Sequence, residues 1–559
     1  MPKNIFKMKK FILLTICLFA SFTAFSQTIT SNSSGNWADG STWVGGVAPG
    51  SGNDVVIAHN VTCNSVKTAN SLTVNAGVTL TVGTSGNLTI TNAVTDNGTI
   101  LVTGSENSSG SFIAKTATDV TNLSVKIFVP RSDGSTPDNW KLVGIPVNGE
   151  TVGDIDDNLA TNGSKVGIGK WDHESNSWDL YTTSETASVL PSNVGYEMLY
   201  KASGGDQLVT FSGSMVTSTT RDSRESVTNT WQLLGNPYPS YVRMSSQATG
   251  AGSASNDYFF DTDNLNKVNA SYQAFYGFDG NAYDTYAHNN TDVTLLMPGD
   301  AFFVYSGGFN TYQFNEAMQV HSSDQGFRGN VVPGGSDDDN RNAEIKFTMS
   351  DNYGTVKYLT MKFGDDFSLS LDPGGDLGAF PYGESDIYSK LVEKDNGVNF
   401  TVQALPYESI VDVTIPIGVK SDSGVMKLDY NVNTLPDYID MYLEDTQENT
   451  FKKITDGFEI NFDEAYEGLG RFYLHFTDQL IPELPTDDNL RIYKGSDSDV
   501  LVMGAVGKNY SAKVYDYSGR LIKEVNFNHK TKINDLDSKM KILRIESEEG
   551  LTIKKFKLN

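Results

Sequence analysis

A short repeat near the N-terminus constrains the fold of this chain more than any other sequence feature. The segments Leu72-Thr-Val74, Leu80-Thr-Val82 and Leu88-Thr-Ile90 recur every 8 residues, with glycines in the turns between them. An apolar-Thr-apolar segment is typical of a β-strand, in which alternate side chains face inward. Strands this short bury their apolar rows by stacking on one another. The repeat therefore predicts a β-helix-like solenoid over residues 27–118, and ordinary hairpins are the alternative.

The rest of the chain also predicts β-structure, divided among further domains. Its length of 559 residues exceeds that of a single hydrophobic core, which rarely passes about 250–300 residues. Residues 119–330 contain two Trp-x-Leu-x-Gly-x-Pro motifs, WKLVGIP at 140–146 and WQLLGNP at 231–237. Residues 341–478 contain at least six alternating segments separated by turn residues, which predicts a β-sandwich. Because no amphipathic stretch of helical period stands out, the fold class we expect is all-β.

Charge and cysteine content exclude several classes of protein. The formal net charge is -26, and nucleic-acid binding needs a basic surface, so we expect no nucleic-acid partner. The acidic charge lies in the body of the chain, since residues 1–26 carry +4 and residues 490–559 carry +5, which leaves -35 for the rest. The two cysteines, Cys17 and Cys63, exclude a disulfide scaffold and a multi-cysteine zinc site.

Residues 1–26 predict a secretory signal peptide. Four lysines precede an apolar stretch, Phe11–Phe25, that is too short to span a membrane comfortably. Small residues at Ala24 and Ser26 place the expected cleavage after Ser26. Cys17 raises the alternative of a lipid anchor, which the large Ile16 before it disfavours. No later segment reaches 18 apolar residues, so we expect the mature chain to lack a transmembrane segment and to lie outside the cell or on its surface.

The last 70 residues differ from the body in charge and pattern. A proline-containing linker is expected at residues 479–489. After it, SAKVYDYSGRLIKEV at 511–525 predicts a strand, a Ser-Gly turn and a second strand, and the chain ends in IKKFKLN. These segments resemble the C-terminal sorting domain of proteins exported by the type IX secretion system of Gram-negative bacteria. The resemblance implies a small C-terminal β-sandwich, contact with the type IX secretion machinery, and a sorting signal at matched positions: Val514, Tyr515, Asp516, Gly519, Arg520, Lys554 and Lys555.

The opening of the solenoid also resembles modules found in type IX cargo proteins. It contains Trp37 and Trp43 within NWADGSTWVGGVAP. These rings fit two roles, either stacking on sugars or covering the end of a solenoid so that its apolar interior is kept from water. The second role is the more common for such residues.

Two aromatic segments are candidates for carbohydrate binding. KWDHESNSWDLY at 170–181 contains Trp171 and Trp178, and predicts a hairpin with a cross-strand tryptophan pair. In SYQAFYGFDGNAYDTYAH at 271–288, Tyr272, Tyr276 and Phe278 share one face by parity. If that face is open, its rings form a platform for sugars; if it is closed, they are core. A closed face is favoured because an exposed aromatic face promotes aggregation.

The sequence contains one calcium-like spacing and no recognised catalytic motif. Asp154, Asp156 and Asn158 follow the first half of a calcium loop, but Leu159 and Lys165 stand where an EF-hand needs glycine and glutamate. No nucleophile elbow, zinc-protease motif or phosphate loop occurs. We therefore expect no cofactor, with calcium as the alternative.

The function expected from the sequence is that of a non-catalytic structural or adhesion protein, an adhesin of the cell surface or a secreted matrix component. The alternatives are a carbohydrate- or calcium-binding accessory protein that contacts surface glycans or polysaccharides, and a polysaccharide-degrading enzyme with the solenoid as its scaffold.

Overall fold

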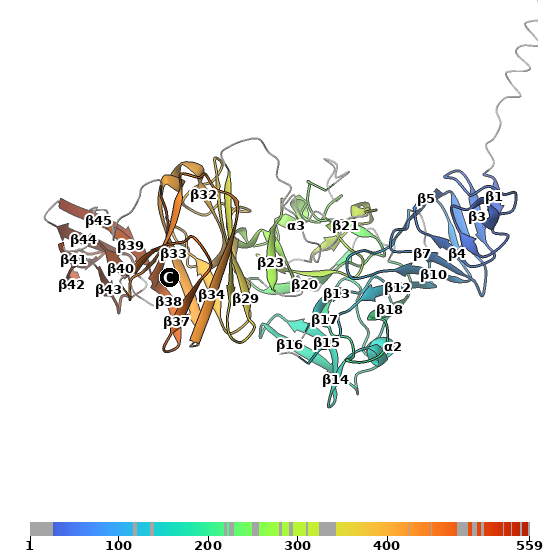
Figure 1. The fold of residues 1–559 in the computed structure, drawn as a ribbon, viewed down its shortest axis with the longest axis horizontal. Helices are drawn as coiled ribbons and strands as arrows, with labels where there is room; N and C mark the ends of the chain where they lie inside the picture. Colours follow the sequence, from blue (N-terminus) through green and yellow to red (C-terminus); the bar gives the residue numbers. More distant parts are fainter. Residues whose placement is uncertain are drawn as a thin grey trace, which may run out of the picture.

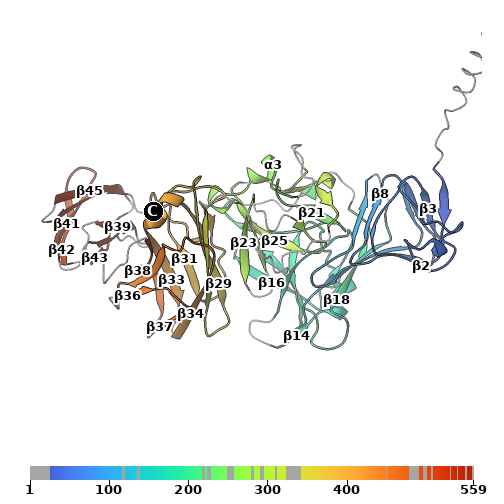
Figure 2. The same cartoon turned by 45° about the horizontal axis from the view of Figure 1, so that its top comes forward.

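The computed structural model describes residues 26–556, except for 116–119, 135–138, 217–220, 223–227, 249–256, 279–281, 290–294, 309–310, 323–341, 423, 449, 478–489, 495–499, 505–507, 529, 538 and 548–549. The predicted signal peptide and linker thus lie outside the described residues. Strands make up 53% of the structure and helices 6%, so the all-β class is confirmed. Four modules follow one another along the long axis of the molecule (Figures 1 and 2). Among the described residues, no helix has the length and apolar character needed to cross a membrane.

The predicted solenoid is present and has three faces, each a parallel sheet. After a short first turn, each full turn adds one strand to each face. The strands are β1 (Thr28–Thr30) and β2 (Gly35–Asn36); β3 (Asp54–Ile57), β4 (Val61–Cys63) and β5 (Val66–Ala69); β6 (Ser71–Val74), β7 (Thr79–Val82) and β8 (Asn87–Ile90); and β9 (Val94–Asp96), β10 (Thr99–Thr103) and β11 (Ser111–Ala114).

The 8-residue spacing separates consecutive strands within one turn of the solenoid, and not stacked strands of successive turns. Leu72, Leu80 and Leu88 lie on β6, β7 and β8, which belong to three different sheets of one turn. The strands that stack are one full turn apart, so Leu80 pairs with Val61 below and Ile100 above. All five side chains are buried. The three similar segments therefore close one triangle, and longer-range pairing builds the stack.

Trp37 and Trp43 seal the N-terminal end of the solenoid. They are 0% and 2% exposed, and their rings meet edge to face with centroids 5.2 Å apart. The indole N–H of Trp43 donates a hydrogen bond to the carbonyl oxygen of Trp37, at 2.8 Å. Both rings belong to the core of the solenoid, so the capping interpretation is confirmed and no sugar can stack on them.

At its other end the solenoid core does not stop at residue 118. Strand β12 (Leu123–Phe128) continues the middle face in parallel with β10. Strand β18 (Leu208–Gly213) then adds to β12 in antiparallel orientation. One hydrophobic core extends from Ile29 to Met215. The solenoid and the first part of the next module are thus a single packing unit.

The middle module is built from two halves with the same strand order. In the first half the sheet runs β13 (Lys141–Gly144), β17 (Gly195–Met198), β15 (Lys165–Asp172), β16 (Ser177–Thr182), and the short β14 (Thr161–Asn162) also pairs with β15. In the second half it runs β20 (Trp231–Gly235), β25 (Ala301–Tyr305), β22 (Ala274–Phe278), β23 (Tyr283–Ala287). Each half begins with one Trp-x-Leu-x-Gly-x-Pro motif, continues with a hairpin, and returns its last strand to the centre of the sheet. The echo in the sequence is therefore an internal structural duplication.

The two halves meet at the glycines of their motifs. A Cβ on Gly144 would stand 2.9 Å from Cα of Gly235, and one on Gly235 would stand 2.7 Å from Cα of Gly144. The N–H of Gly144 donates to Gly299 O at 3.1 Å, and the N–H of Gly235 donates to Asn193 O at 3.4 Å. Gly299 and Asn193 hold equivalent positions before β25 and β17. Because each contact is made twice in exchanged roles, the halves are related by an approximate two-fold axis.

The third module is one 11-stranded sheet that curls around its core, in place of the two separate sheets of a sandwich. Strands β29 and β38 lie far apart in the sheet order, yet Phe363 and Phe476 on them meet with centroids 4.9 Å apart. The strands are β28 (Ala343–Ser350), β29 (Val356–Gly364), β30 (Leu377–Gly378), β31 (Asp386–Ser389), β32 (Phe400–Pro406), β33 (Asp412–Ser421), β34 (Gly424–Thr434), β35 (Asp440–Asp445), β36 (Thr450–Lys453), β37 (Phe458–Phe462) and β38 (Tyr466–Thr477).

The C-terminal module has two antiparallel sheets and a small core of its own. One sheet contains β39 (Arg491–Lys494), β40 (Val500–Met503) and β43 (Lys530–Ile533). The other runs β42 (Leu521–Asn528), β41 (Asn509–Asp516), β44 (Lys541–Ser547), β45 (Gly550–Phe556). Val502, Val514 and Leu543, each 0% exposed, pack between them.

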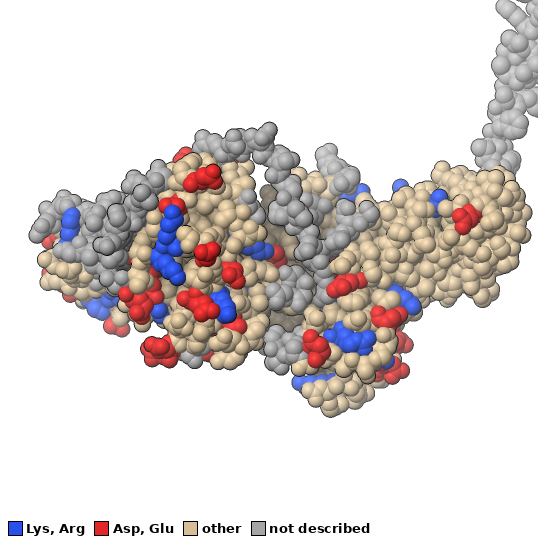
Figure 3. Space-filling view, viewed as in Figure 1, with Lys and Arg blue, Asp and Glu red and all other residues tan. Residues whose placement is uncertain are grey.

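Charge is distributed unevenly over these modules. In Figure 3 the visible face of the solenoid is almost free of charged side chains, whereas the third module shows many acidic and several basic ones. This matches the low charge of the repeat-containing segment of the sequence.

Candidate functional site

The predicted tryptophan hairpin is formed by β15 and β16. Trp171 and Trp178 are cross-strand partners, and their rings meet edge to face with centroids 5.2 Å apart. Trp171 is 7% exposed and Trp178 is half-buried. The Trp171 ring also contacts Phe303 of the second half, at 5.0 Å. The pair thus faces inward, toward the rest of the protein.

The second aromatic segment is buried in the same place. Tyr276 on β22 is fully buried, while Tyr272 and Phe278 are half-buried beside it. The ring of Trp231 contacts those of Tyr276 and Tyr272, with centroids 4.8 and 5.6 Å apart. The Tyr276 hydroxyl donates a hydrogen bond to Gly378 O of the third module, at 2.8 Å, and burial raises the pKa of this hydroxyl well above its ordinary value. The closed-face alternative therefore holds, and these rings do not form a platform for sugars.

A short segment of the third module closes this face. Phe380 lies between rings of the middle module. Its ring centroid is 4.6 Å from that of Trp231, 4.5 Å from that of Tyr283 and 4.7 Å from that of Phe303. Tyr382 follows it and contacts Tyr283 at 4.8 Å. We call this cluster the aromatic junction: Trp171, Trp178, Trp231, Tyr272, Tyr276, Phe278, Tyr283 and Phe303 of the middle module, with Phe380 and Tyr382 of the third.

The candidate calcium ligands serve the local fold. The Asp154 carboxylate accepts hydrogen bonds from the N–H and hydroxyl of Thr151, at 3.0 and 2.6 Å, and caps helix α2 (Val152–Ile155). Asp156 and Asn158 belong to the short 3-10 turn that follows. In the part of the chain that the structure describes, no three His, Cys, Asp or Glu side chains gather as a metal site would require.

Sequence reasoning missed one chain of polar side chains in the third module. Thr414 Oγ1 lies 3.0 Å from His475 Nδ1, and His475 Nε2 lies 2.8 Å from Glu444 Oε2. The signal for it is strand parity, which puts His475 and Glu444 on the outer face of paired strands β38 and β35. A Thr-His-Glu order resembles that of a nucleophile, base and acid. Here His475 and Glu444 are 4% and 1% exposed, so the group is positioned as a buried polar network.

The predicted sorting turn in the C-terminal module is organised by Asp516. Its carboxylate accepts hydrogen bonds from the hydroxyl and N–H of Ser518, at 2.6 and 2.9 Å, and from the N–H of Arg520, at 3.0 Å. The hydrogen bond from the Ser518 hydroxyl is the largest cause that lowers the pKa of Asp516. Gly519 has φ +85°, which favours glycine. The turn presents Tyr517, 86% exposed, at its tip.

The other predicted sorting residues occupy different surroundings. Val514 is a core residue at 0% exposure, whereas Tyr515 is half-buried on the opposite face of β41. Lys554 and Lys555 are exposed on β45, a strand at the edge of its sheet. They line a cleft between the C-terminal and third modules. The structure therefore does not bring the seven residues together at one point.

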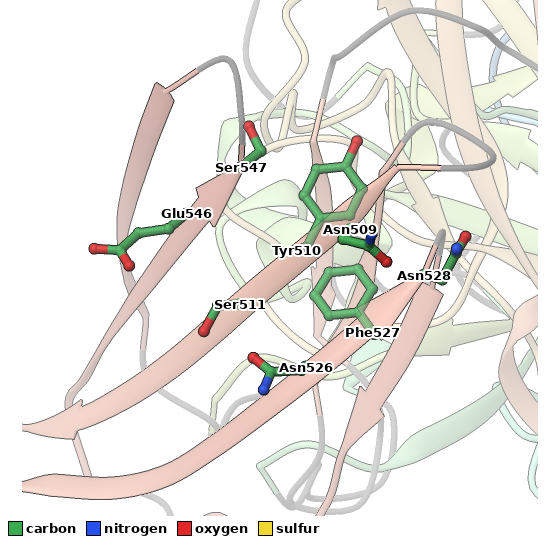
Figure 4. A pocket seen from close by; sticks show the side chains of 8 residues that line it. All are labelled: Asn509, Tyr510, Ser511, Asn526, Phe527, Asn528, Glu546 and Ser547. Carbon is green, nitrogen blue, oxygen red and sulfur yellow. The ribbon is translucent and has the colours of Figure 1, made fainter.

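A shallow hollow of about 590 Å³ lies at one end of the same sheet (Figure 4). Tyr510 and Phe527 stack beside it with centroids 5.1 Å apart. Ser511, Asn526 and Glu546 are cross-strand neighbours that point away from these rings. This hollow is a shallow feature of the surface of the C-terminal module.

Fold and surface together define an all-β protein of several modules whose last module is a separate packing unit. The chain belongs to the family of a domain of unknown function, DUF8693, whose model matches residues 28–476. The match covers the solenoid, the middle module and the third module up to its last strand, and it leaves out the C-terminal module. No curated protein matches the chain.

Proposed function

We propose that this protein is an exported structural or adhesion protein of the cell surface or the surrounding medium, delivered by a type IX-like secretion route. Its body, residues 27–477, is the working part. Its C-terminal module is the part that the export machinery recognises. The main support for this proposal is the separate C-terminal module, which has its own core and lies outside the family match.

The shape of the body supports a structural role. Three of the four modules join through continuous packing, because the solenoid core extends to Met215 and the aromatic junction joins the middle module to the third. A rigid elongated body presents large β-faces and loops, which suits multivalent contacts that are weak singly and strong together. The acidic third module disfavours association between copies and keeps the surface hydrated.

Deletion of residues 490–559 tests the export part of this proposal. In the native host, the truncated protein should stop at the periplasm, while the full chain should reach the surface or the medium, as measured by cell fractionation and immunoblotting. Release of the truncated protein at the full-chain level would overturn the assignment. A finer test is the double variant Lys554→Gln/Lys555→Gln, with Lys523→Gln/Lys532→Gln in the same module as the matched control.

Glycan arrays and polysaccharide turnover test the structural role against its rivals. The purified mature protein, with and without calcium, should show no turnover above a blank. Turnover would replace the proposal with an enzymatic function. Calcium-dependent binding to one glycan class would replace it with an accessory binding function.

A further inference from the structure

A buried carboxyl group lies within the aromatic junction. Glu197 is on β17 of the middle module and is 9% exposed. In the duplicated second half, the equivalent position on β25 is Phe303, because both residues lie opposite the motif strand in the same register: Glu197 faces Leu142, and Phe303 faces Leu233. The same position in the fold therefore accepts a ring in one half and a carboxyl group in the other.

The packing around Glu197 is tight and lacks polar partners. A Cβ on Gly169 would stand 2.8 Å from Glu197 Oε1 and 3.0 Å from Leu180 Cδ2, so the carboxyl group packs closely against this glycine. Trp171 and Trp178 lie on the same face of the neighbouring strands. Among the described residues, no hydrogen bond or ion pair reaches the Glu197 carboxyl group, and burial raises its pKa to about 8. The uncharged, protonated form is the one that this site accommodates.

The carboxyl group is linked to the third module through Tyr283. Burial, and after it the charge of Glu197, raises the pKa of the Tyr283 hydroxyl. The Tyr283 ring contacts Phe380 and Tyr382 of the third module. The Tyr283 N–H also donates a hydrogen bond to the Tyr382 hydroxyl, at 3.4 Å. A change at Glu197 therefore reaches the module boundary through one ring.

Other titratable groups surround this boundary. Tyr283 is the titratable group that interacts with Glu197, and Tyr382 contacts Tyr283 in turn. His173 lines a small hollow beside Trp171. Lys170 points to the other face of its sheet, where it pairs with Asp179 at 3.1 Å. Further along the boundary lie His288 and the ion pair of Lys346 with Asp284, at 2.7 Å. The third module adds the buried groups Lys357 and Asp376 and the half-buried Asp386.

We propose that the aromatic junction is a proton-controlled latch, in which protonated Glu197 keeps the third module seated on the middle module and ionised Glu197 loosens it. Seating is the closed state, with Phe380 between Trp231, Tyr283 and Phe303. Loosening is the withdrawal of Phe380 and Tyr382, which gives water access to the carboxylate.

The direction of the pH effect follows from the two states of Glu197. Its pKa is about 8 in the closed state and returns toward the ordinary 4.5 when water reaches it. Closing therefore takes up a proton between these pH values, and each pH unit in that window disfavours closing by up to tenfold. The Asp376 carboxylate, whose pKa burial raises to about 7, accepts hydrogen bonds from the N–H groups of Asp372 and Ala404 inside the third module. Burial lowers the pKa of His288, which opposes the effect only below its ordinary 6.5. Burial also lowers the pKa of Lys357 to about 8, which favours closing only as pH rises above that value. Loosening is therefore expected mainly between pH 6.5 and 8.

Tryptophan emission and small-angle scattering of the mature full chain measure this equilibrium. Three of the six tryptophans, Trp171, Trp178 and Trp231, lie in the junction, so opening shifts emission to the red. The variant Phe380→Ala weakens the seat and brings the two states near balance. We expect this variant to show a red shift and a larger maximum dimension as pH rises from 6 to 8.5. Adding Glu197→Gln should keep it closed throughout.

Glu174→Gln is the matched control, because Glu174 is an exposed carboxylate at the tip of the neighbouring hairpin. The variant Phe380→Ala/Glu174→Gln should open as Phe380→Ala does. The latch would be overturned if Phe380→Ala had the same tryptophan emission and the same maximum dimension at pH 6 and 8.5. It would also be overturned if the double variant Phe380→Ala/Glu197→Gln opened as pH rises. If Phe380→Ala does not fold, carbon-13 labelling of glutamate in the wild-type chain decides. A titration midpoint of Glu197 near 8 supports the latch, and one near 4.5 overturns it.

Discussion

The two halves of the middle module share a strand order but differ in their neighbours. The core of the first half merges with the solenoid and extends from Ile29 to Met215. The second half has a separate aromatic core, and its outer face seats the third module. The same unit thus connects in two directions along the molecule. The halves also differ at equivalent positions, since the first half has Glu197 where the second has Phe303.

The largest effect is expected where the two halves meet. In Gly235→Val, the added side chain would meet Cα of Gly144 and Val194 O, both 2.7 Å from its Cβ. We expect the free energy of unfolding to fall by about 5 kcal/mol or more, since backbone atoms cannot move aside. Urea unfolding followed by tryptophan fluorescence measures it. A loss under about 1 kcal/mol would contradict the close contact of the halves.

The motif tryptophans sharpen the comparison, since they are equivalent in sequence and different in burial. Trp231 is 3% exposed within the aromatic junction, and Trp140 is half-buried. Trp231→Ala should cost about 4 kcal/mol, because it leaves a large cavity among rings. Trp140→Ala should cost about 1 kcal/mol. Equal losses in parallel urea titrations would show that the halves are packed alike.

A buried ion pair joins the halves on one side of the axis only. Lys141 lies 3.4 Å from Asp300, and both side chains are about 5% exposed. The exchanged positions hold Gln232 and Val194. Lys141→Gln should cost about 3 kcal/mol by leaving a buried carboxylate without its lysine. The double variant Lys141→Gln/Asp300→Val copies the other side and should recover most of the loss, which a double-mutant cycle measures; no recovery would argue against the two-fold relation.

The smallest predicted effect concerns pH in the first half. Glu150 is 1% exposed, and burial raises its pKa to about 7, although it accepts a hydrogen bond from the Ser212 N–H. A raised pKa means that stability is highest below 4.5 and declines as pH approaches 7. We expect this decline to exceed that of Glu150→Gln by about 2 kcal/mol. Urea unfolding at pH 4.5 and 7 measures it. The exposed Glu174→Gln should behave as the wild type does.

Local pattern carried most of the fold. Strand segments, the solenoid, the tryptophan cap and the two motifs were predictable because alternation and turn residues act over a few positions. The geometry of the solenoid was not, because Leu72, Leu80 and Leu88 look like stacked strands until the full-turn pairing is known. The curled third sheet likewise depends on contacts between strands far apart in the chain, as between Phe363 and Phe476.

The candidate sites were less predictable for the same physical reason. Parity indicates which side chains share a face, and it grouped Trp171 with Trp178 correctly. It does not indicate what covers that face. Phe380, which closes it, lies about a hundred residues beyond Tyr276. Glu197 was missed because a single carboxyl group in a strand carries no spacing signal, and its surroundings come from three separate segments.

The three-sided turn also determines how much length the N-terminal solenoid gains for each residue of its sequence. Leu80 and Ile100, stacked neighbours, are 20 residues apart, and each added turn lengthens a stack of strands by about 4.8 Å. An extended chain would cover the same distance with about two residues. The solenoid therefore gains little length per residue and forms a wide support. Most residues of each turn add to the width of the solenoid and to its resistance to bending. A family member could gain or lose whole turns while both ends keep their structure.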